Sequence, residues 1–326
     1  MAGDNILVVR LGAMGDILHT LPAVASIKHS YPRSTVAWAV DPKWSFLLAG
    51  NPFVDEILPL PRRRLGDIIS SIKLLRGRRF QTVIDFQGLI QSAIVATLAR
   101  PDQIFGFHYS ELRERLAALF YSNPVQTRAR HVVDKNLELA KAAGAANILH
   151  AFPLPAGKPE GQLPDGDFVL ACPLAGWTSK QWPLEYYGRL GKRLESELGL
   201  PLVLNGPPEA IPQFQKVPHV LSNGSGLQGL IHATRRATAV VGLDSGPLHL
   251  AAALEKPGVA IFGPTDPGRN GPYGSSFKVL RSQRAKTSYK RRSEIDPSML
   301  DISPDDVFEA LKAVIAKPFR ASRASV

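Results

Sequence analysis

The sequence predicts an α/β protein made of two Rossmann-like domains, each built on a parallel sheet. Short β-branched runs alternate with amphipathic stretches, and this alternation stops once near the middle and then restarts. Strands that are buried on both faces and alternate with helices are typical of parallel sheets assembled from βα units. The length of 326 residues also exceeds what one core usually serves. We expect the two halves to face a central cleft, with ligands at the carboxyl ends of the strands.

The first half carries the clearer periodicity. The expected strands are residues 6–11, 35–40 and 82–86, and the expected helices are residues 17–29, 66–75, 89–98 and 132–143. In the second of these helices apolar side chains recur at three- and four-residue spacing, which predicts an apolar stripe with arginines on the other face. The stripe consists of Leu65, Ile68, Ile69, Ile72 and Leu75.

The second half repeats the pattern after a Pro- and Gly-rich stretch over residues 152–166, which has the composition of a linker. Its expected strands are 168–172, 202–205, 239–243 and 259–262, with helices near 184–197, 227–234 and 247–254. We therefore expect an N-terminal domain over residues 1–158 and a C-terminal domain over residues 159–303. We expect residues 304–326 to form a last helix and a basic tail. Packing of this helix back on the N-terminal domain is one option.

Composition narrows the class of protein. Hydrophobic residues make up 44% and charged residues 21%, as in an ordinary soluble protein, and no run of about eighteen apolar residues predicts a membrane span. The N-terminus leads directly into an apolar strand without the basic start of a secretory signal, so we expect a cytoplasmic protein. The single cysteine, Cys172, excludes an internal disulfide and a cysteine-rich metal site, and fits a small core residue.

The net charge of +11 indicates an anionic partner. The N-terminal half holds most of the excess, and its densest cluster is opposed by one acid, Asp67. The cluster consists of Arg62, Arg63, Arg64, Lys73, Arg76, Arg78 and Arg79. Such a cluster attracts phosphates, carboxylates, an anionic membrane surface or nucleic acid, or forms a solvated helix face. It lacks the interleaved aromatic residues of RNA-recognition strands, which argues against nucleic acid.

The segment 11–20 follows the first strand and leads into a helix. Its two glycines allow a sharp turn and a close approach to a ligand, and amides at the helix start could face an anion. It lacks the third glycine of the dinucleotide fingerprint, which argues against a dehydrogenase, and the Gly-Lys-Ser/Thr of a P-loop. Asp16 is read either as a helix-capping acid or as a general base at the mouth of the cleft.

Three segments of the second half could hold phosphate. In residues 240–249 a strand runs into a helix, and the amides of Ser245 and Gly246 with His249 form a reasonable diphosphate cradle; a capped helix is the alternative. Residues 263–268 form a rigid loop after the next strand, lining the same cleft or making only a tight turn. In residues 175–183, Lys180 suits a phosphate as a point charge, although a lone lysine is more often a surface residue.

Together these segments resemble the heptosyltransferases of lipopolysaccharide inner-core synthesis, the family 9 glycosyltransferases. The resemblance runs from Ile6 to about Gly274 and depends on ordered matches across both halves, since each match alone is weak. The matching segments are residues 14–23, 85–93, 111–121, 180–183, 244–253 and 263–267.

The resemblance implies the GT-B fold and an inverting reaction that needs no metal or other cofactor. The donor, ADP-heptose, would bind the C-terminal half, and the Kdo sugar of Kdo-lipid A would bind the N-terminal half. It also implies a cytoplasmic enzyme, peripheral on the anionic inner face of the inner membrane, with no nucleic acid and no obligate protein partner.

Roles for individual residues follow from the matched positions. Asp16 would act as the base and Lys180 would stabilise the leaving diphosphate. Arg10 would hold the donor phosphate or position Asp16. The expected donor site comprises Arg10, Thr178, Ser179, Lys180, Leu227, Asp244, Ser245, Gly246 and His249. The expected acceptor site comprises Gly15, Arg62, Arg63, Arg64, Gln87 and Arg113.

Some residues depart from the family's pattern. Gly176 and Trp177 replace polar residues expected near the phosphates, Ser245 replaces a threonine, and residues 285–297 match nothing. Two other functions therefore stay open. One is an enzyme of the same fold that uses another nucleotide sugar for a surface glycan, and the other is a nucleotide-binding protein without catalysis.

Overall fold

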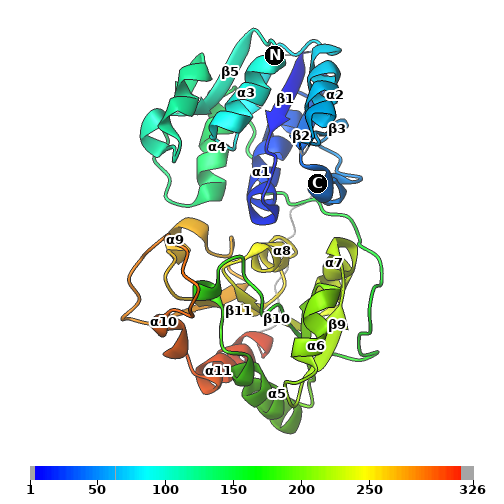
Figure 1. The fold of residues 1–326 in the computed structure, drawn as a ribbon, viewed down its shortest axis with the longest axis vertical. Helices are drawn as coiled ribbons and strands as arrows, with labels where there is room; N and C mark the ends of the chain where they lie inside the picture. Colours follow the sequence, from blue (N-terminus) through cyan, green and yellow to red (C-terminus); the bar gives the residue numbers. More distant parts are fainter. Residues whose placement is uncertain (1–3, 63, 317–326) are drawn as a thin grey trace. The chain divides into compact units, whose positions relative to one another are not determined.

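The computed structural model describes residues 4–62 and 64–316. The chain divides into two compact units, unit 1 up to Pro155 and unit 2 from Ala156 onward (Figure 1). Each unit contains one parallel sheet of six strands flanked by helices, so the predicted fold class is confirmed.

Unit 1 has the strand order β3-β2-β1-β4-β5-β6, and all paired strands are parallel. Its strands are β1 (Asn5–Val9), β2 (Thr35–Val40), β3 (Glu56–Pro59), β4 (Thr82–Asp85), β5 (Gln103–Phe107) and β6 (Asn123–Val125). Its α-helices are α1 (Met14–Ser30), α2 (Leu65–Arg76), α3 (Ile90–Leu98) and α4 (Val132–Ala142). Three 3-10 turns join them: η1 (Pro42–Leu48), η2 (Tyr109–Glu111) and η3 (Arg115–Phe120).

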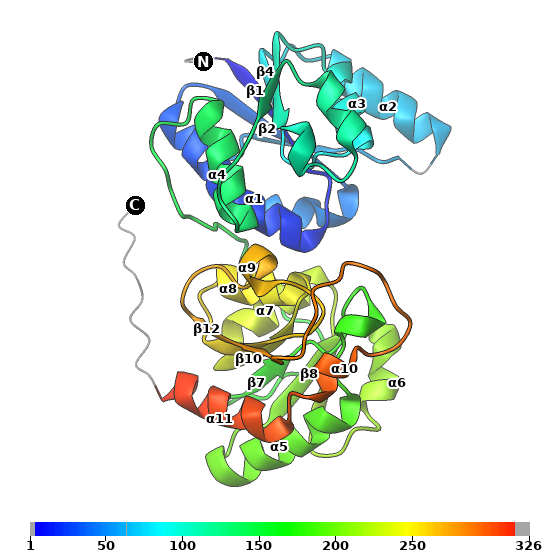
Figure 2. The same ribbon diagram turned by 90° about the vertical axis from the view of Figure 1, so that its left-hand side faces the viewer.

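The strand order reverses direction at β1. The chain moves one way from β1 to β2 and β3, and the other way from β4 to β5 and β6. Because parallel crossovers are right-handed, the helices of the two directions cover opposite faces of the sheet. Helices α1 and α4 pack together on one face, and α2 and α3 lie side by side on the other (Figure 2).

The strands and helices predicted for unit 1 are present, but β3, β5 and β6 were not predicted. They have four, five and three residues, and the sequences of β5 (QIFGF) and β6 (NPV) contain Gly, Pro and polar residues. Such strands form because neighbouring strands pair with them, so their own sequences give little signal.

The apolar stripe of α2 is not buried as an amphipathic helix usually buries it. Leu65 is 75% exposed, Ile68 42% and Ile69 46%, and the buried side chains of the helix are Ser71 and Leu75. The pattern predicted the helix correctly, but three of the five side chains of the stripe are exposed.

Unit 2 has the strand order β12-β11-β10-β7-β8-β9, again parallel at every pairing. Its strands are β7 (Val169–Ala171), β8 (Leu202–Gly206), β9 (Leu221–Gly224), β10 (Ala239–Leu243), β11 (Gly258–Phe262) and β12 (Phe277–Arg281). Its longer helices are α5 (Leu184–Leu198), α7 (Leu227–Arg236), α8 (Gly246–Ala253) and α11 (Pro304–Ile315). The shorter ones are η4 (Thr178–Lys180), η5 (Pro208–Ala210), α6 (Ile211–Phe214), α9 (Pro267–Asn270) and α10 (Pro297–Leu300).

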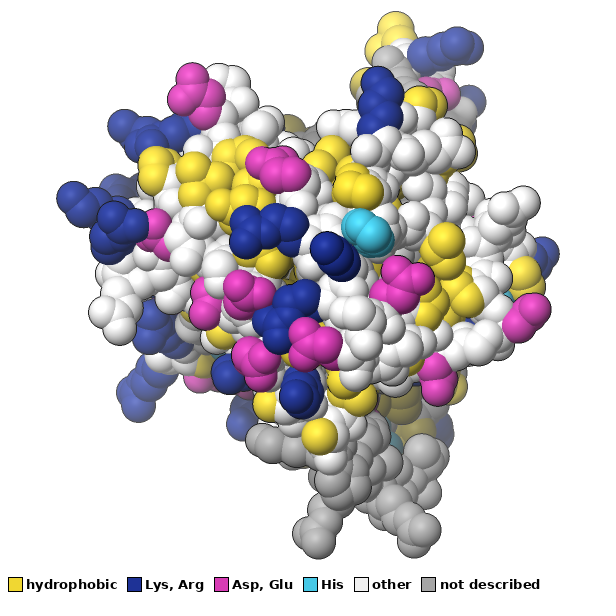
Figure 3. All heavy atoms as spheres, turned by 90° about the horizontal axis from the view of Figure 1, so that it is seen from below, with side chains coloured by type: hydrophobic (Ala, Val, Ile, Leu, Met, Phe, Trp, Pro, Cys, Tyr) yellow, Lys and Arg dark blue, Asp and Glu magenta, His cyan; other side chains and the backbone are white. Residues whose placement is uncertain are grey.

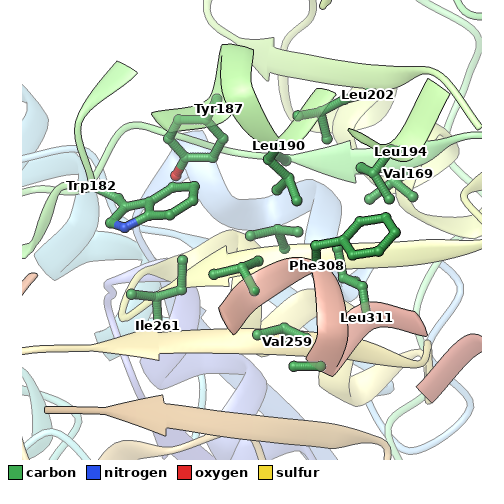
Figure 4. Close-up of a cluster of buried hydrophobic side chains, with 14 of the residues drawn as sticks. Val169, Trp182, Tyr187, Leu190, Leu194, Leu202, Val259, Ile261, Phe308 and Leu311 are labelled. Carbon is green, nitrogen blue, oxygen red and sulfur yellow. The ribbon is translucent and has the colours of Figure 1, made fainter. Parts of the chain in front are cut away.

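The last helix, α11, belongs to unit 2 and packs on α5 and β11. Phe308 and Leu311 lie in one buried cluster with Leu190 and Leu194 of α5 and with strand residues such as Val259 (Figure 4). The expectation that this helix packs back on the N-terminal domain is therefore not met, because its apolar face completes the core of unit 2. The predicted basic tail lies beyond the described residues, which end at position 316.

The connection between the units, residues 143–168, contains no helix or strand, as the Pro- and Gly-rich composition predicts. Its second part is fixed on unit 2. The Lys158 amide donates to the Gln228 carbonyl at 3.2 Å, and the Gly226 amide at the start of α7 donates to the Glu160 carboxylate at 2.6 Å. Gly161 has a positive φ of 71°, and a Cβ there would lie 2.2 Å from the Asn223 side-chain oxygen.

Two predictions from composition can be compared with the structure. Cys172 is buried, as expected, and burial raises the pKa of its thiol to about 12. Within residues 4–62 and 64–316, no helix has the length and apolar character needed to cross a bilayer.

Gly161→Ala tests the packing of the connection on unit 2. We expect the free energy of unfolding to fall by about 2–4 kcal/mol, because the methyl group clashes with Asn223 and the backbone needs a left-handed conformation. Gly166→Ala is the matched control, since its Cβ would meet nothing within 4 Å, and should change stability by less than about 0.5 kcal/mol. Urea unfolding measures both, and equal values for the two variants would contradict this packing.

Candidate functional site

The candidate site of unit 1 lies where β1 and β4 end. These strands are neighbours, with Val9 paired to Asp85, so the segments that follow them meet at one edge of the sheet. The β1 segment leads into α1 at Met14, and the β4 segment leads through Gln87 to α3.

Asp16 lies in the first turn of α1, at its third residue, rather than at the cap position itself. One carboxylate oxygen accepts a hydrogen bond from the Ala13 amide at 3.0 Å, and the other lies 2.8 Å from Nη2 of Arg10. The Asp16 side chain is 45% exposed and the Arg10 side chain 9%. A buried guanidinium therefore orients a carboxylate that is still exposed to solvent, which is an arrangement that a base could use.

Arg10 is itself fixed by the backbone of the neighbouring strand. Its Nη1 donates to the Phe86 carbonyl, and its own carbonyl accepts from the Trp38 indole at 3.1 Å. The side-chain oxygen of Gln87 accepts from the Leu11 amide at 2.8 Å, which ties the two segments together. The structure thus pairs Arg10 with Asp16, and Gln87 uses its carbonyl oxygen within the protein.

A buried acid behind this edge was not singled out from the sequence. The Asp85 carboxylate accepts hydrogen bonds from the Ser92 hydroxyl at 2.7 Å, the Tyr121 hydroxyl at 2.8 Å and the Gln87 and Gly88 amides at 2.8 and 3.3 Å. Burial raises the pKa of Asp85, and these hydrogen bonds oppose that rise. Its signal in the sequence is an acid at the end of a buried strand, and its role is to fix the Gln87 segment.

The arginines expected to bind the acceptor differ in surroundings. Arg62 is 21% exposed and lies 3.2 Å from the Asp41 carboxylate, so it is paired. Arg64 is exposed just before α2, and Arg113 is 79% exposed and 3.5 Å from Glu114. Arg63 lies outside the described residues. Gly15, the second residue of α1, adjoins Asp16 in the chain.

In unit 2 the best-defined feature is an ion pair between two of the segments that the sequence predicts to hold phosphate. Nζ of Lys180 lies 2.7 Å from the Asp244 carboxylate and 3.2 Å from the Asp244 carbonyl. His249 Nε2 lies 3.8 Å from the other carboxylate oxygen. Burial alone would raise the pKa of Asp244, but the neighbouring His249 and the charge of Lys180 outweigh it and lower the pKa to about 2. Asp244 therefore positions two groups that can face an anion.

Three buried hydroxyls lie beside this ion pair at the same edge of the sheet. Ser179 follows β7, Ser245 follows β10 and Thr265 follows β11, and these strands are consecutive in the order β11-β10-β7. None of the three hydroxyl oxygens has a hydrogen-bond partner in the described part of the chain. Buried polar groups normally have partners, so the cluster of hydroxyls beside a lysine indicates a site that an anionic ligand completes.

The remaining predicted donor residues occupy the same edge. Thr178 adjoins Ser179 in η4, and Leu227 is the half-buried first residue of α7. Gly246 begins α8, where the first amides of a helix have no partner within the helix. Amides, hydroxyls and a cation thus gather where β7 and β10 end, as a phosphate group requires.

Two features of this edge differ from the sequence interpretation. Trp177, which departs from the family's pattern, contacts two cations, with Lys180 Nζ 4.4 Å and the Arg291 guanidinium 5.6 Å from its ring centroid. The segment 285–297, which matched nothing, borders the site. The Ser288 amide donates to the Pro264 carbonyl at 2.7 Å, and the Asp296 amide donates to the Ser179 carbonyl at 3.3 Å.

In residues 4–62 and 64–316, no three His, Cys, Asp or Glu side chains gather closely enough to hold a metal ion.

Solved structures share the fold of this chain. E. coli heptosyltransferase WaaC with ADP-2-deoxy-2-fluoro heptose superposes with a TM-score of 0.76 at 23% identity, covering 95% of this chain and 99% of that one. A family 9 glycosyltransferase from Veillonella parvula gives a TM-score of 0.79 at 20% identity, covering 96% and 97%. The fold is therefore GT-B, that of a two-domain glycosyltransferase.

The sequence profile of glycosyltransferase family 9 (heptosyltransferase) matches residues 68–298. The chain belongs to this family and is a glycosyltransferase. Lipopolysaccharide heptosyltransferase 1 of Escherichia coli K12 is 28% identical over 86% of this chain and 94% of its own length. The protein of the same name from Pseudomonas aeruginosa is 29% identical over 96% and 99%.

Asp244→Asn tests the ion pair. Because the folded-state pKa of Asp244 is below its ordinary value of 3.8, the carboxylate stabilises the protein at neutral pH, and this contribution is lost as the pH falls towards about 2. We expect a loss of about 2 kcal/mol or more at pH 7, because Lys180 loses its buried partner, and a smaller difference below about pH 4. Urea unfolding across this pH range measures it.

Asp305→Asn is the control, because it also removes a carboxylate from an ion pair, with Arg193, but on the surface of unit 2. It should cost less than about 1 kcal/mol at pH 7. If Asp244→Asn cost no more than Asp305→Asn, the buried pair would not hold this edge together.

Proposed function

We propose that this enzyme transfers heptose from ADP-heptose to the Kdo sugar of Kdo-lipid A, with inversion at the anomeric carbon and without a metal ion. The observation that carries the proposal is the exposed Asp16 carboxylate held by buried Arg10 at the edge of the unit 1 sheet. The family and its relatives supply the substrate class, since curated relatives are lipopolysaccharide heptosyltransferases and one solved neighbour carries a fluoro analogue of ADP-heptose.

The donor is assigned to unit 2. Its diphosphate would accept hydrogen bonds from the buried hydroxyls of Ser179 and Ser245 and from the amides that begin α8, and Lys180 would supply positive charge. His249, which lies beside Asp244, would also contact the diphosphate. Leu227, at the start of α7, would contact the nucleoside. Among the described residues the Ser179 and Ser245 hydroxyls have no hydrogen-bond partner, so a diphosphate that accepts from them would break no hydrogen bond of the fold.

The acceptor is assigned to unit 1, with Asp16 as the base. Asp16 takes the proton of the acceptor hydroxyl while the hydroxyl oxygen forms a bond to the anomeric carbon of heptose. The bond from that carbon to the diphosphate breaks on the opposite side, ADP leaves with the electron pair, and the configuration inverts. Arg10 acts through Asp16 and is a positioning residue. Of its two expected roles, the ion pair favours this one over holding the donor phosphate.

Independence from metal is proposed because protein groups can balance the negative charge on the departing ADP. Lys180 and the helix-start amides would stabilise it as it develops, which is the work that a divalent cation performs in other transferases. The Lys180 ammonium and the Arg291 guanidinium both lie over the Trp177 ring, at 4.4 and 5.6 Å from its centroid, so a second cation lies close to this edge.

The acceptor's carboxylates and phosphates would face the basic side chains of unit 1, with Arg64 and Arg113 the more exposed of those described. Arg62 would need to share its charge with Asp41, and Arg63 completes the basic run in the sequence. We further propose that the enzyme works in the cytoplasm as a peripheral protein of the inner membrane, where an anionic lipid acceptor is presented.

The nucleotide of the donor separates this proposal from an enzyme of the same family that uses another sugar nucleotide. We expect ADP to raise the melting temperature by several degrees at saturating concentration, and UDP and GDP to have little effect, since only a ligand that binds the folded state stabilises it. The shift should be the same with EDTA as with magnesium. Stabilisation by UDP or GDP instead, or only with magnesium, would contradict the donor or the metal independence.

Asp16→Asn tests the base. Transfer should fall by about 10²–10⁴-fold in kcat, because the amide cannot take the proton, while ADP affinity stays unchanged. Asp306→Asn is the matched control: Asp306 is also the third residue of a helix, α11, and accepts from the amide that precedes the helix, Ser303, at 3.0 Å. That variant makes the same substitution at the equivalent position of another helix, outside the proposed site, and should leave transfer intact. Full transfer by Asp16→Asn would remove Asp16 from this role.

A further inference from the structure

Exposed apolar side chains gather on one part of unit 1. Of the twelve large hydrophobic side chains that are exposed among the described residues, eight lie between positions 65 and 120. The eight are Leu65, Ile68 and Ile69 of α2, Ile94 of α3, Tyr109 of η2, and Leu116, Leu119 and Phe120 of η3. Leu119 is 81% exposed and Leu116 62%, and at three-residue spacing in a 3-10 turn they project from one side. A gathering of this kind marks an interaction site.

These elements are continuous with one another. Helix α3 contacts α2 on one side and η3 on the other, and α2 and α3 lie side by side in Figure 2. Between them is a groove of about 450 Å³ whose lining is largely aliphatic, with Arg62 and Glu114 as its charged members. Exposed Ile68 of α2 and Ile94 of α3 line this groove, and η3, which carries the exposed leucines, contacts α3. We call α2, α3 and η3 the apolar face.

The charges around the apolar face are mainly positive. Its exposed basic side chains are Arg64, Lys73, Arg76, Arg79, Arg113 and Arg115. The acids nearby, Asp67 and Glu114, are half-buried, and the Asp67 carboxylate is occupied at the start of α2, where it accepts from the Arg64 amide at 3.1 Å. By contrast, the end of unit 2 seen in Figure 3 mixes both signs, with Arg193 paired to Glu197, Asp305 and Glu309.

Apolar side chains beside excess positive charge fit an anionic lipid bilayer. Arginine and lysine can reach headgroup phosphates while leucine, isoleucine and phenylalanine enter the boundary of the acyl chains. A second copy of this chain fits worse, because two copies of the face would bring six exposed cations against six others. The chain's own C-terminal sequence fits worse for the same reason, since it adds Lys317, Arg320 and Arg323.

We propose that α2, α3 and η3 form a membrane-docking surface, in which Leu65, Leu116 and Leu119 insert below the headgroups of an anionic bilayer and the surrounding basic side chains contact its phosphates. The inference deepens the proposed function, in that it gives the peripheral enzyme a defined attachment surface, and it rests on that function only for the lipid nature of the acceptor. It explains why α2 leaves its apolar stripe exposed: the bilayer, not the core, covers it.

The test is co-sedimentation of the full chain with vesicles. One set of vesicles is phosphatidylcholine alone, and the other contains about one-third phosphatidylglycerol. The double variant Leu116→Ser/Leu119→Ser should bind the anionic vesicles about tenfold or more weakly than the parent, because two leucines no longer insert. Leu221→Ser/Leu300→Ser is the matched control, since both leucines are 47% exposed but belong to unit 2, and it should bind like the parent.

The outcomes separate the proposal from its rivals. Equal vesicle binding by the parent and the double variant would overturn the proposal. If high salt also abolished that binding, attraction by charge alone would account for it. Sedimentation velocity without lipid reports self-association. If the parent were a dimer and the double variant a monomer, the apolar face would be an interface between copies of this chain, and the proposal would be wrong.

Transfer activity keeps this proposal distinct from the proposed function. With a water-soluble, deacylated acceptor, the double variant should transfer heptose like the parent, because neither leucine belongs to the proposed site. Loss of that activity would mean that the two leucines serve the site rather than the membrane. If neither protein transferred heptose but vesicle binding still depended on the leucines, the docking surface would stand and the proposed function would fall.

Discussion

The ion pair between Arg10 and Asp16 is the interaction on which the proposed chemistry of unit 1 depends. A carboxylate in the first turn of a helix is ordinary, because the helix start stabilises negative charge. What distinguishes Asp16 is that a buried guanidinium fixes it while nearly half of the side chain stays exposed. That guanidinium can be buried because the Phe86 carbonyl accepts from it, and buried Asp85 fixes the segment after β4. The parallel pairing of β1 with β4 therefore brings the residues of this candidate site together at one edge of the sheet.

In unit 2, the structure holds a positive charge at the edge of the sheet, where it can contact an anion. Lys180 is half-buried, and a cation taken partly out of water needs an opposite charge beside it. Asp244 supplies the partner for Lys180 and also faces His249. Within residues 4–62 and 64–316, the hydroxyls of Ser179 and Ser245 have no hydrogen-bond partner. Hydroxyls without partners cost free energy in the folded protein. Under the proposed function, a bound diphosphate would remove this cost by accepting hydrogen bonds from them.

The apolar face gives a separate reason for the basic character of unit 1. Charge alone fits an anionic acceptor and an anionic membrane equally well, because both present phosphates. The exposed leucines of α2 and η3 separate the two, since a soluble anion gains nothing from them. An enzyme that acts on a lipid-linked acceptor benefits from a surface that holds it at the bilayer.

The sequence by itself determined the two α/β halves, the linker and the order of the ligand-binding segments, because these depend on local periodicity, on Gly and Pro, and on matches that are contiguous in the chain. It also singled out Asp16, Lys180 and Ser245 as candidate site residues. Only the tertiary structure decided that Asp16 pairs with Arg10, that α11 completes the core of unit 2, and that residues 285–297 border the edge where Ser179 and Lys180 lie. These depend on side chains from distant segments meeting in space, and local sequence patterns carry no information about such meetings.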